Sequence, residues 1–414
     1  MRSHSLPPLT LGLDVVTPEG SLPRGAARRV TNVVLANDGA FSMRPGFDPL
    51  FIDLPRAHSF WISPAQTRVF AAADTTLYEI DLDAGTATAL FTALPFDQPV
   101  EYDDVGPDVY FTCAGVLRKV APDGTVRRPG VASLVGVRPT LAATTGGLPP
   151  GRYGVAYGLV NDLGEESGTS NIAWITLATG GGIALSGIQT AANVEYAQLY
   201  ITAPNGPVLR RQQKVAIAAT ASIVDDARGD ACTRLNLQPM PGGSIVRYHK
   251  GRVYVVDGNW VWISDPLDYG VSNVESGWLT VRRTITSFQP VAGGIFMGLR
   301  ERTVFLAGDG PEDFRHVNAS AHGALPQSGT VVPPDFFSSG ISKSQDQPVA
   351  AWLSEIGLAI GRVDGSIAYP QENRIALTGG ASRPLFAQYH GIKQGIFCVE
   401  SLETGTGGAV DSTI

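Results

Sequence analysis

Apolar and polar residues alternate along most of this 414-residue chain, in short runs separated by turn residues. The clearest example is Arg252–Ser264 (RVYVVDGNWVWIS), in which two apolar runs flank an Asp-Gly-Asn turn. Alternation with a period of two predicts half-buried β-strands, and Asp-Gly between two of them predicts a hairpin. No window of ten residues or more shows the i, i+3, i+4, i+7 apolar spacing of an amphipathic helix. The pattern therefore predicts an all-β fold.

The same two-strand frame recurs along the chain. Its other copies are Arg68–Ile80, Asp108–Val120, Gly294–Leu306 and Glu355–Tyr369, with a partial copy at Gln394–Leu402. Each frame follows another apolar segment, and several precede a fourth. Frames begin 40 residues apart at Arg68 and Asp108, and four strands in about 40 residues is the size of a propeller blade. We predict a β-propeller of six blades, or of seven if Thr330–Ser342 contains another.

Two of the intervals between successive frames are longer than one blade. Residues 138–227 contain a different series of short strands, including the alternating Pro149–Val160, and several strands in about 90 residues fit an immunoglobulin-like or fibronectin-type sandwich. The predicted domains are 1–137 (N-terminal arm and first blades), 138–227 (inserted sandwich) and 228–414 (remaining blades). The second long interval, between the frames that begin at Gly294 and Glu355, contains Ala321–Pro334, which we interpret as a long inter-strand loop.

The two ends of the chain are expected to close the propeller ring, since a closed ring leaves no exposed sheet edge. Ala27–Leu35 and Gly39–Met43 flank Asn37-Asp38-Gly39, which is a strong hairpin signal. We expect this hairpin to complete the blade begun by Pro384–Tyr389 and Ile396–Glu400.

Composition narrows the function classes. The 48 glycines and 29 prolines leave little room for helices. Charged residues make up 17%, below the roughly 25% of ordinary soluble domains, so we expect partners to cover part of the surface. A net charge of −7 argues against binding nucleic acid by counter-ion release but would let DNA slide past. We predict no membrane span and no signal peptide. The three cysteines are scattered along the chain, so we predict free thiols in a cytosolic protein.

We predict no catalytic, cofactor-binding or metal-binding residue. The histidines lack metal-site spacing: His4, His58, His249, His316, His322 and His390. There is no GxSxG, Walker A or GxGxxG motif, and Gly180–Gly182 and Gly407–Gly408 are interpreted as turn glycines. Carboxylates gather at Asp162–Glu166 and Gly308–Asp313 without EF-hand spacing, so we interpret both as solvated hairpin turns, with calcium binding as the alternative. A propeller glycosidase, which needs only two carboxylates, is the alternative enzymatic function.

Two regions resemble a known family. Thr31–Leu35 followed by Gly39–Phe47 (GAFSMRPGF) resembles the opening of phage tail and neck proteins, in which an Asn-x-x-Leu strand leads to an Arg-Pro-Gly-Phe/Tyr corner. Leu148–Tyr153, Tyr157–Gly168 and Tyr200–Thr202 are similar to the fibronectin-type module inserted in such proteins, where Tyr-Arg-Thr is usual instead of Tyr-Ile-Thr. The chain thus resembles the tail nozzle, or tail tubular, proteins of short-tailed bacteriophages, of the type that stabilises packaged DNA.

The resemblance implies a non-enzymatic structural protein of the virion tail, made in the host cytoplasm. It implies a homohexameric ring that continues the DNA channel below the portal or adaptor, helps retain the genome and then conducts it during DNA ejection. The implied partners are further copies of the chain, the adaptor or portal ring, tail fibres or tailspikes, and double-stranded DNA that passes without sequence recognition. The alternatives are a glycan-binding or glycan-cleaving propeller and a scaffold propeller for protein partners. Ala321–Pro334 is the candidate gating or inter-subunit loop, against an ordinary surface connection.

Overall fold

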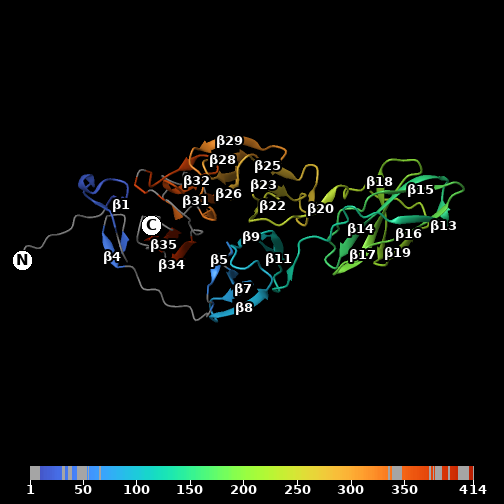
Figure 1. Cartoon of the computed structure of the whole chain (residues 1–414), viewed down its shortest axis with the longest axis horizontal. Coiled ribbons are helices and arrows are strands. Elements are labelled where there is room, and N and C mark those ends of the chain that lie inside the picture. Colours follow the sequence, from blue (N-terminus) through green and yellow to red (C-terminus); the bar gives the residue numbers. More distant parts are fainter. Residues whose placement is uncertain are drawn as a thin grey trace, which may run out of the picture. The chain divides into compact units, whose positions relative to one another are not determined.

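The computed structural model of the protein is built almost entirely of β-strands (Figure 1). It describes residues 10–29, 33–35, 40–43, 54, 56–64, 67–333, 336–337, 347–372, 374–375, 377, 385–389, 392–399 and 410–413. The helical element that the structure describes in full is the 3-10 turn η1 (Glu19–Ser21). No helix of the described chain is long and apolar enough to cross a membrane.

The chain divides into two compact units. The first comprises Met1–Ala73, Tyr78–Ala89 and Val281–Ile414, and the second comprises Asp74–Leu77 and Leu90–Thr280.

One four-stranded sheet recurs five times in the described residues, and in each the strands lie side by side in chain order. The sheets are β5 (His58–Ile62), β6 (Val69–Ala73), β7 (Thr76–Asp81), β8 (Thr86–Phe91); β9 (Glu101–Val105), β10 (Asp108–Cys113), β11 (Val116–Val120), β12 (Val126–Arg127); β21 (Ile245–His249), β22 (Arg252–Asp257), β23 (Trp260–Ile263), β25 (Trp278–Thr280); β26 (Ile285–Val291), β27 (Gly294–Leu299), β28 (Thr303–Ala307), β29 (Arg315–Ser320); and β30 (Thr330–Val332), β31 (Val349–Ser354), β32 (Gly357–Gly361), β33 (Ile367–Ala368). The predicted all-β fold and its repeated four-strand unit are confirmed.

Burial changes from the second to the fourth strand of these sheets. All residues of β6, β27 and β31 are buried, whereas β29 is mostly exposed. A strand covered on both faces needs a continuous apolar run, such as Val253–Val256 in β22, and these runs produce the recurring frame. The sequence pattern therefore marks the inner strands more clearly than the outer ones.

The fifth sheet differs from the sequence interpretation by one strand. Ala321–Pro334 is not only a loop, because β30 lies within it and pairs with β31, with Val331 opposite Ala350. The frame Glu355–Tyr369 therefore covers the third and fourth strands of this sheet, whereas the other four complete frames cover the second and third. A strand of only three residues, between Gly329 and Pro333, is too short to show alternation. The described part of Thr330–Ser342 thus contributes one strand to this sheet.

The sheets near the two ends of the chain are small. β3 (Val33–Leu35) pairs with β4 (Phe41–Met43), and β34 (Leu385–Tyr389), β35 (Ile392–Val399) and β36 (Val410–Thr413) form a three-stranded sheet. The predicted turn at 37–39 lies outside the described residues. In the described chain each of these sheets pairs only within itself, so ring closure by these strands stays a prediction. A further short pair, β1 (Gly12–Leu13) with β2 (Ala26–Ala27), is parallel.

Residues 138–227 form two sheets over one hydrophobic core, in the green part of Figure 1. One sheet has the order β13 (Thr140–Leu148), β16 (Gly181–Ser186), β19 (Thr220–Ile223), and the other β15 (Ala173–Leu177), β14 (Gly151–Asn161), β17 (Val194–Thr202), β18 (Leu209–Ala216). Ile183 and Ile223 of the first sheet and Tyr153, Tyr157 and Leu199 of the second are fully buried in this core. Beyond it, β20 (Leu237–Pro239) pairs with β24 (Val271–Asn273).

Candidate functional site

The hairpin of β11 and β12 carries two basic dipeptides, Arg118-Lys119 and Arg127-Arg128. Lys119 lies directly opposite Arg127 in the antiparallel register. Residues directly opposite share a face and neighbours along a strand point to opposite faces, so Arg118 lies on the face away from Lys119. Four basic residues of one hairpin are thus divided between two environments.

The cations of the first face are paired with the turn between β14 and β15. The Lys119 ammonium lies 2.7 Å from Glu165 and 3.4 Å from Asp108. The Arg127 guanidinium lies 2.6 Å from Asp162 and holds the pKa of that carboxyl below its usual range. Three carboxylates therefore neutralise these two cations.

Asn161 organises this turn from the end of β14. Its side-chain oxygen accepts the backbone N–H groups of Leu163 at 3.0 Å and Glu165 at 2.8 Å, and its side-chain amide donates to the Glu165 carboxylate at 2.8 Å. Gly164 supplies a positive φ of 79°. An Asn with this local bonding pattern followed by Gly closes a turn, and here it aims Asp162 and Glu165 at the hairpin.

Glu166 centres a buried network at the end of the same turn. Its side chain is 6% exposed, and it accepts hydrogen bonds from the Tyr200 hydroxyl and the Arg211 guanidinium. Arg234 lies 3.9 Å away and is paired with Asp268. Burial, followed by the bond to Glu166, raises the pKa of Tyr200. Through Arg234 the network ties the two-sheet module to the segment that follows it.

These pairs change the interpretation of Asp162–Glu166 as a solvated turn. Each of its carboxylates contacts a cation that is distant in sequence, which local spacing cannot show. No group of three or more His, Cys, Asp or Glu side chains that could hold a metal ion occurs among the described residues.

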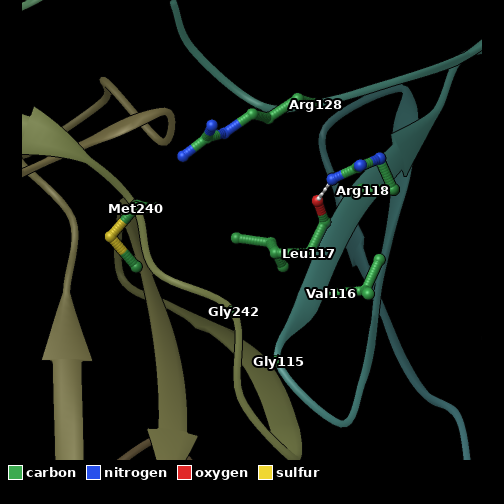
Figure 2. A pocket seen from close by; sticks show the side chains of 7 residues that line it. All are labelled: Gly115, Val116, Leu117, Arg118, Arg128, Met240 and Gly242. Carbon is green, nitrogen blue, oxygen red and sulfur yellow. Dashed lines mark hydrogen bonds between the residues drawn. The ribbon is translucent and has the colours of Figure 1, made fainter. Parts of the chain in front are cut away.

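A pocket of about 220 Å³ borders the same hairpin (Figure 2). Its lining consists of Gly115, Val116, Leu117, Arg118, Arg128, Met240 and Gly242. Leu117 and Met240 are buried and apolar, Arg118 is half-buried and Arg128 is exposed. The pocket therefore combines an apolar wall with two guanidinium groups.

The pocket wall is fixed by backbone contacts around Gly243. The Thr112 hydroxyl donates to the Gly243 carbonyl at 2.7 Å and accepts the Gly243 N–H at 3.1 Å, while the Gly115 N–H donates to the same carbonyl at 3.1 Å. A Cβ atom on Gly242 would lie 1.9 Å from the Gly115 carbonyl oxygen. Glycine at 242 is therefore what allows the two segments to approach.

The two pocket arginines have no carboxylate partner among the described residues. Arg118 donates to the Leu117 carbonyl at 2.8 Å and lies over the Phe91 ring, 5.5 Å from its centre. Burial lowers the pKa of Arg118, and the charge of Arg128 lowers it further. The site thus carries positive charge that the described chain does not neutralise. Paired basic dipeptides in a predicted hairpin were the available sequence signal for it.

An aromatic cluster was also missed. Trp260 and Trp278, which are 38% and 37% exposed, have ring centres 4.9 Å apart, and Trp262 stacks at 5.8 Å from Trp260. Trp262 lies opposite Trp278 in the β23–β25 register. The Trp-x-Trp spacing and the short outer strand were its sequence signal.

The remaining sequence candidates do not come together. His322 lies 2.8 Å from Glu355, and His58 lies 2.9 Å from the Ser59 hydroxyl. Gly180 has a φ of 78°, and a Cβ there would lie 2.6 Å from the Leu148 carbonyl oxygen, which fits a turn role. His4, His390 and Gly407–Gly408 lie outside the described residues. Cys113 and Cys232 are free, and burial raises the pKa of the Cys113 thiol to about 11.

Comparison with known proteins finds likeness at the level of solved structures. No family model matches the chain, and no curated protein matches it. The WD40 domain of Neurospora crassa Pan2 is similar at 10% identity over 82% of this chain and 85% of that one, with a TM-score of 0.33. BBS1N, from a complex with ARL6DN, is similar at 9% identity over 87% and 91%, with a TM-score of 0.34. Citrobacter koseri AztD is similar at 12% identity over 86% and 85%, with a TM-score of 0.30. At these values the likeness assigns no function.

Proposed function

We propose that the protein is a structural component of a phage virion, the tail nozzle of a short-tailed phage, with no enzymatic role. In this role identical copies form a ring that continues the DNA channel below the portal or adaptor. The observation that carries the proposal is a module suited to rigidity: repeated sheets with fully buried second strands, interrupted by a two-sheet insert held by ion pairs of Lys119 with Glu165, Arg127 with Asp162 and Arg234 with Glu166. A rigid unit of this kind suits a wall that must keep its shape while DNA moves past it.

We infer that the five four-stranded sheets and the β34–β36 sheet are blades of one propeller. Each four-stranded sheet follows chain order, and burial declines toward the fourth strand in β8, β25 and β29. That decline is expected when the first strands face a common centre and the last faces outward.

We infer that residues 138–227 form an immunoglobulin-like sandwich with a permuted strand order. The Tyr153 hydroxyl donates to the carbonyl of Pro149, four residues upstream, at 2.7 Å, which is the bond of a tyrosine corner at the start of strand F. With β14 as F, the strands β15, β17 and β18 fall at G, C and C′, and β13 and β16 at E and B. β19 then lies beside B, in the place of strand A.

Assembly tests the proposal. We expect the purified chain to form a ring of six 43.7-kDa copies in mass photometry and electron microscopy, alone or on addition of an adaptor ring. Net negative charge would keep DNA mobile in the bore. A stable monomer that turns over glycans would contradict the proposal.

A glycan-binding role is the second candidate, and the exposed Trp260 and Trp278 favour it. Indole faces pack against the C–H faces of sugar rings, and exposed aromatic side chains otherwise cost hydration. Retardation of the protein in gels containing host polysaccharide, abolished by Trp260→Ala, would support this role. Equal mobility of both proteins in such gels would exclude it.

A further inference from the structure

We propose that the Arg118–Arg128 pocket binds a carboxylate carried next to a small apolar side chain, presented by another polypeptide. This inference goes beyond the nozzle proposal and does not depend on it. The ligand would be an acidic chain end or an acidic residue at the tip of a loop of the partner protein.

Charge is the first argument. Five other arginines of the same unit have carboxylate partners, namely Arg127, Arg211, Arg228, Arg234 and Arg247. Arg118 and Arg128 line one pocket without such a partner in the described chain, although the chain is net acidic. A guanidinium presents a planar fork of donors that matches a carboxylate in a bidentate manner. An incoming carboxylate would also relieve the repulsion between the two arginines.

The apolar wall is the second argument, because it distinguishes a carboxylate-bearing residue from a bare inorganic anion. Leu117 and Met240 are buried and line the pocket with Val116. A phosphate ion has no surface that would gain from contact with these groups, whereas an aliphatic side chain does.

Size and rigidity are the third argument. The pocket volume of about 220 Å³ lies below the roughly 300–1,000 Å³ of sites for drug-sized ligands, so it suits a single residue. The bonds of Thr112 and Gly115 to Gly243 hold the wall in place before a ligand arrives. A preformed site loses less free energy to ordering on binding.

N-acetyl-leucine tests this chemistry, since it mimics a chain end with one apolar side chain and one carboxylate. We expect saturation-transfer NMR with the full chain at low ionic strength to give a Kd on the order of 1 mM for a single-residue probe. N-acetyl-leucinamide, which lacks the charge, should bind at least about tenfold more weakly, and added salt should weaken only the acid. Equal binding of acid and amide would overturn the proposal.

Inorganic phosphate is the second arm of this titration. We expect it to compete poorly with N-acetyl-leucine because it makes no contact with the apolar wall. Equal competition would overturn the carboxylate assignment and leave a site for simple anions.

Arg128→Gln is the decisive variant, because this exposed side chain can be changed without disturbing the core. Loss of a charge-assisted bond should weaken N-acetyl-leucine binding about tenfold, with an unchanged unfolding midpoint. Arg138→Gln, at an exposed arginine of the same unit outside the pocket, is the matched control and should bind as the parent does. Unchanged binding by Arg128→Gln, or an equal loss in Arg138→Gln, would overturn the proposal.

Discussion

The four cations of the β11–β12 hairpin differ in how their charges are met. Lys119 and Arg127 contact carboxylates of the turn between β14 and β15. Arg118 and Arg128 instead line a pocket that contains no carboxylate. In a chain with few charged residues this contrast separates cations that hold the molecule together from cations available to a partner. Single substitutions test this difference.

Glu166→Gln should produce the largest effect. The change leaves Arg211 and Arg234 without their shared carboxylate beside a buried Tyr200 hydroxyl. We expect a loss of about 3 kcal/mol in the free energy of unfolding, measured by urea titration with tryptophan fluorescence. Glu195→Gln, at an exposed position of β17, is the control and should change the midpoint little. Equal effects of the two variants would show that the network adds nothing to stability.

Lys119→Gln tests the difference between paired and unpaired cations of the hairpin directly. The Lys119 side chain is 9% exposed and meets both Glu165 and Asp108. Loss of a charge-assisted bond in a nearly buried place should cost about 2 kcal/mol in the same titration. Arg128→Gln should leave the unfolding midpoint unchanged, since its charge has no carboxylate partner in the described chain. A comparable loss in Arg128→Gln would remove the distinction.

Asp103 adds a pH dependence at the other edge of the same sheet. Its carboxylate accepts the Tyr248 N–H at 2.6 Å, and burial raises its pKa to about 6 despite the charge of Arg247. The folded protein therefore holds this proton more tightly than the unfolded chain, so its stabilising contribution is full below about pH 4 and is lost as the pH rises through about 6. Relative to Asp103→Asn, the parent should lose roughly 1 to 2 kcal/mol between these values in urea titrations. Parallel pH profiles of the two proteins would refute the shift.

Asp162→Asn should produce the smallest effect. Asp162 and Arg127 are each 31% exposed, so water and salt screen their pair. We expect a lower unfolding midpoint at low ionic strength and no difference from the parent at high salt. A salt-independent loss would mean that the pair is more enclosed than its exposure indicates.

The sequence predicted the repeated sheets because strands buried on both faces require apolar runs, as in β22. It missed β30, because three residues between Gly329 and Pro333 are too few to show a period. The domain boundaries at 137 and 227 and the closure of the ring stay predictions.

The candidate site was beyond sequence reasoning for a different reason. The partners of Lys119 and Arg127 are Glu165 and Asp162, which lie tens of residues away. Nothing local distinguishes Arg127, which is paired, from Arg128, which is not. The two-residue period of the strand separates them only once the register with Lys119 is known.

A single hydroxyl, that of Thr112, both donates to and accepts from Gly243. Valine has nearly the same shape and neither of these bonds, so Thr112→Val would loosen the segment that carries Gly242 while every charge stays in place. The rate at which ligands enter and leave the pocket could thereby be tuned separately from the chemistry that selects them.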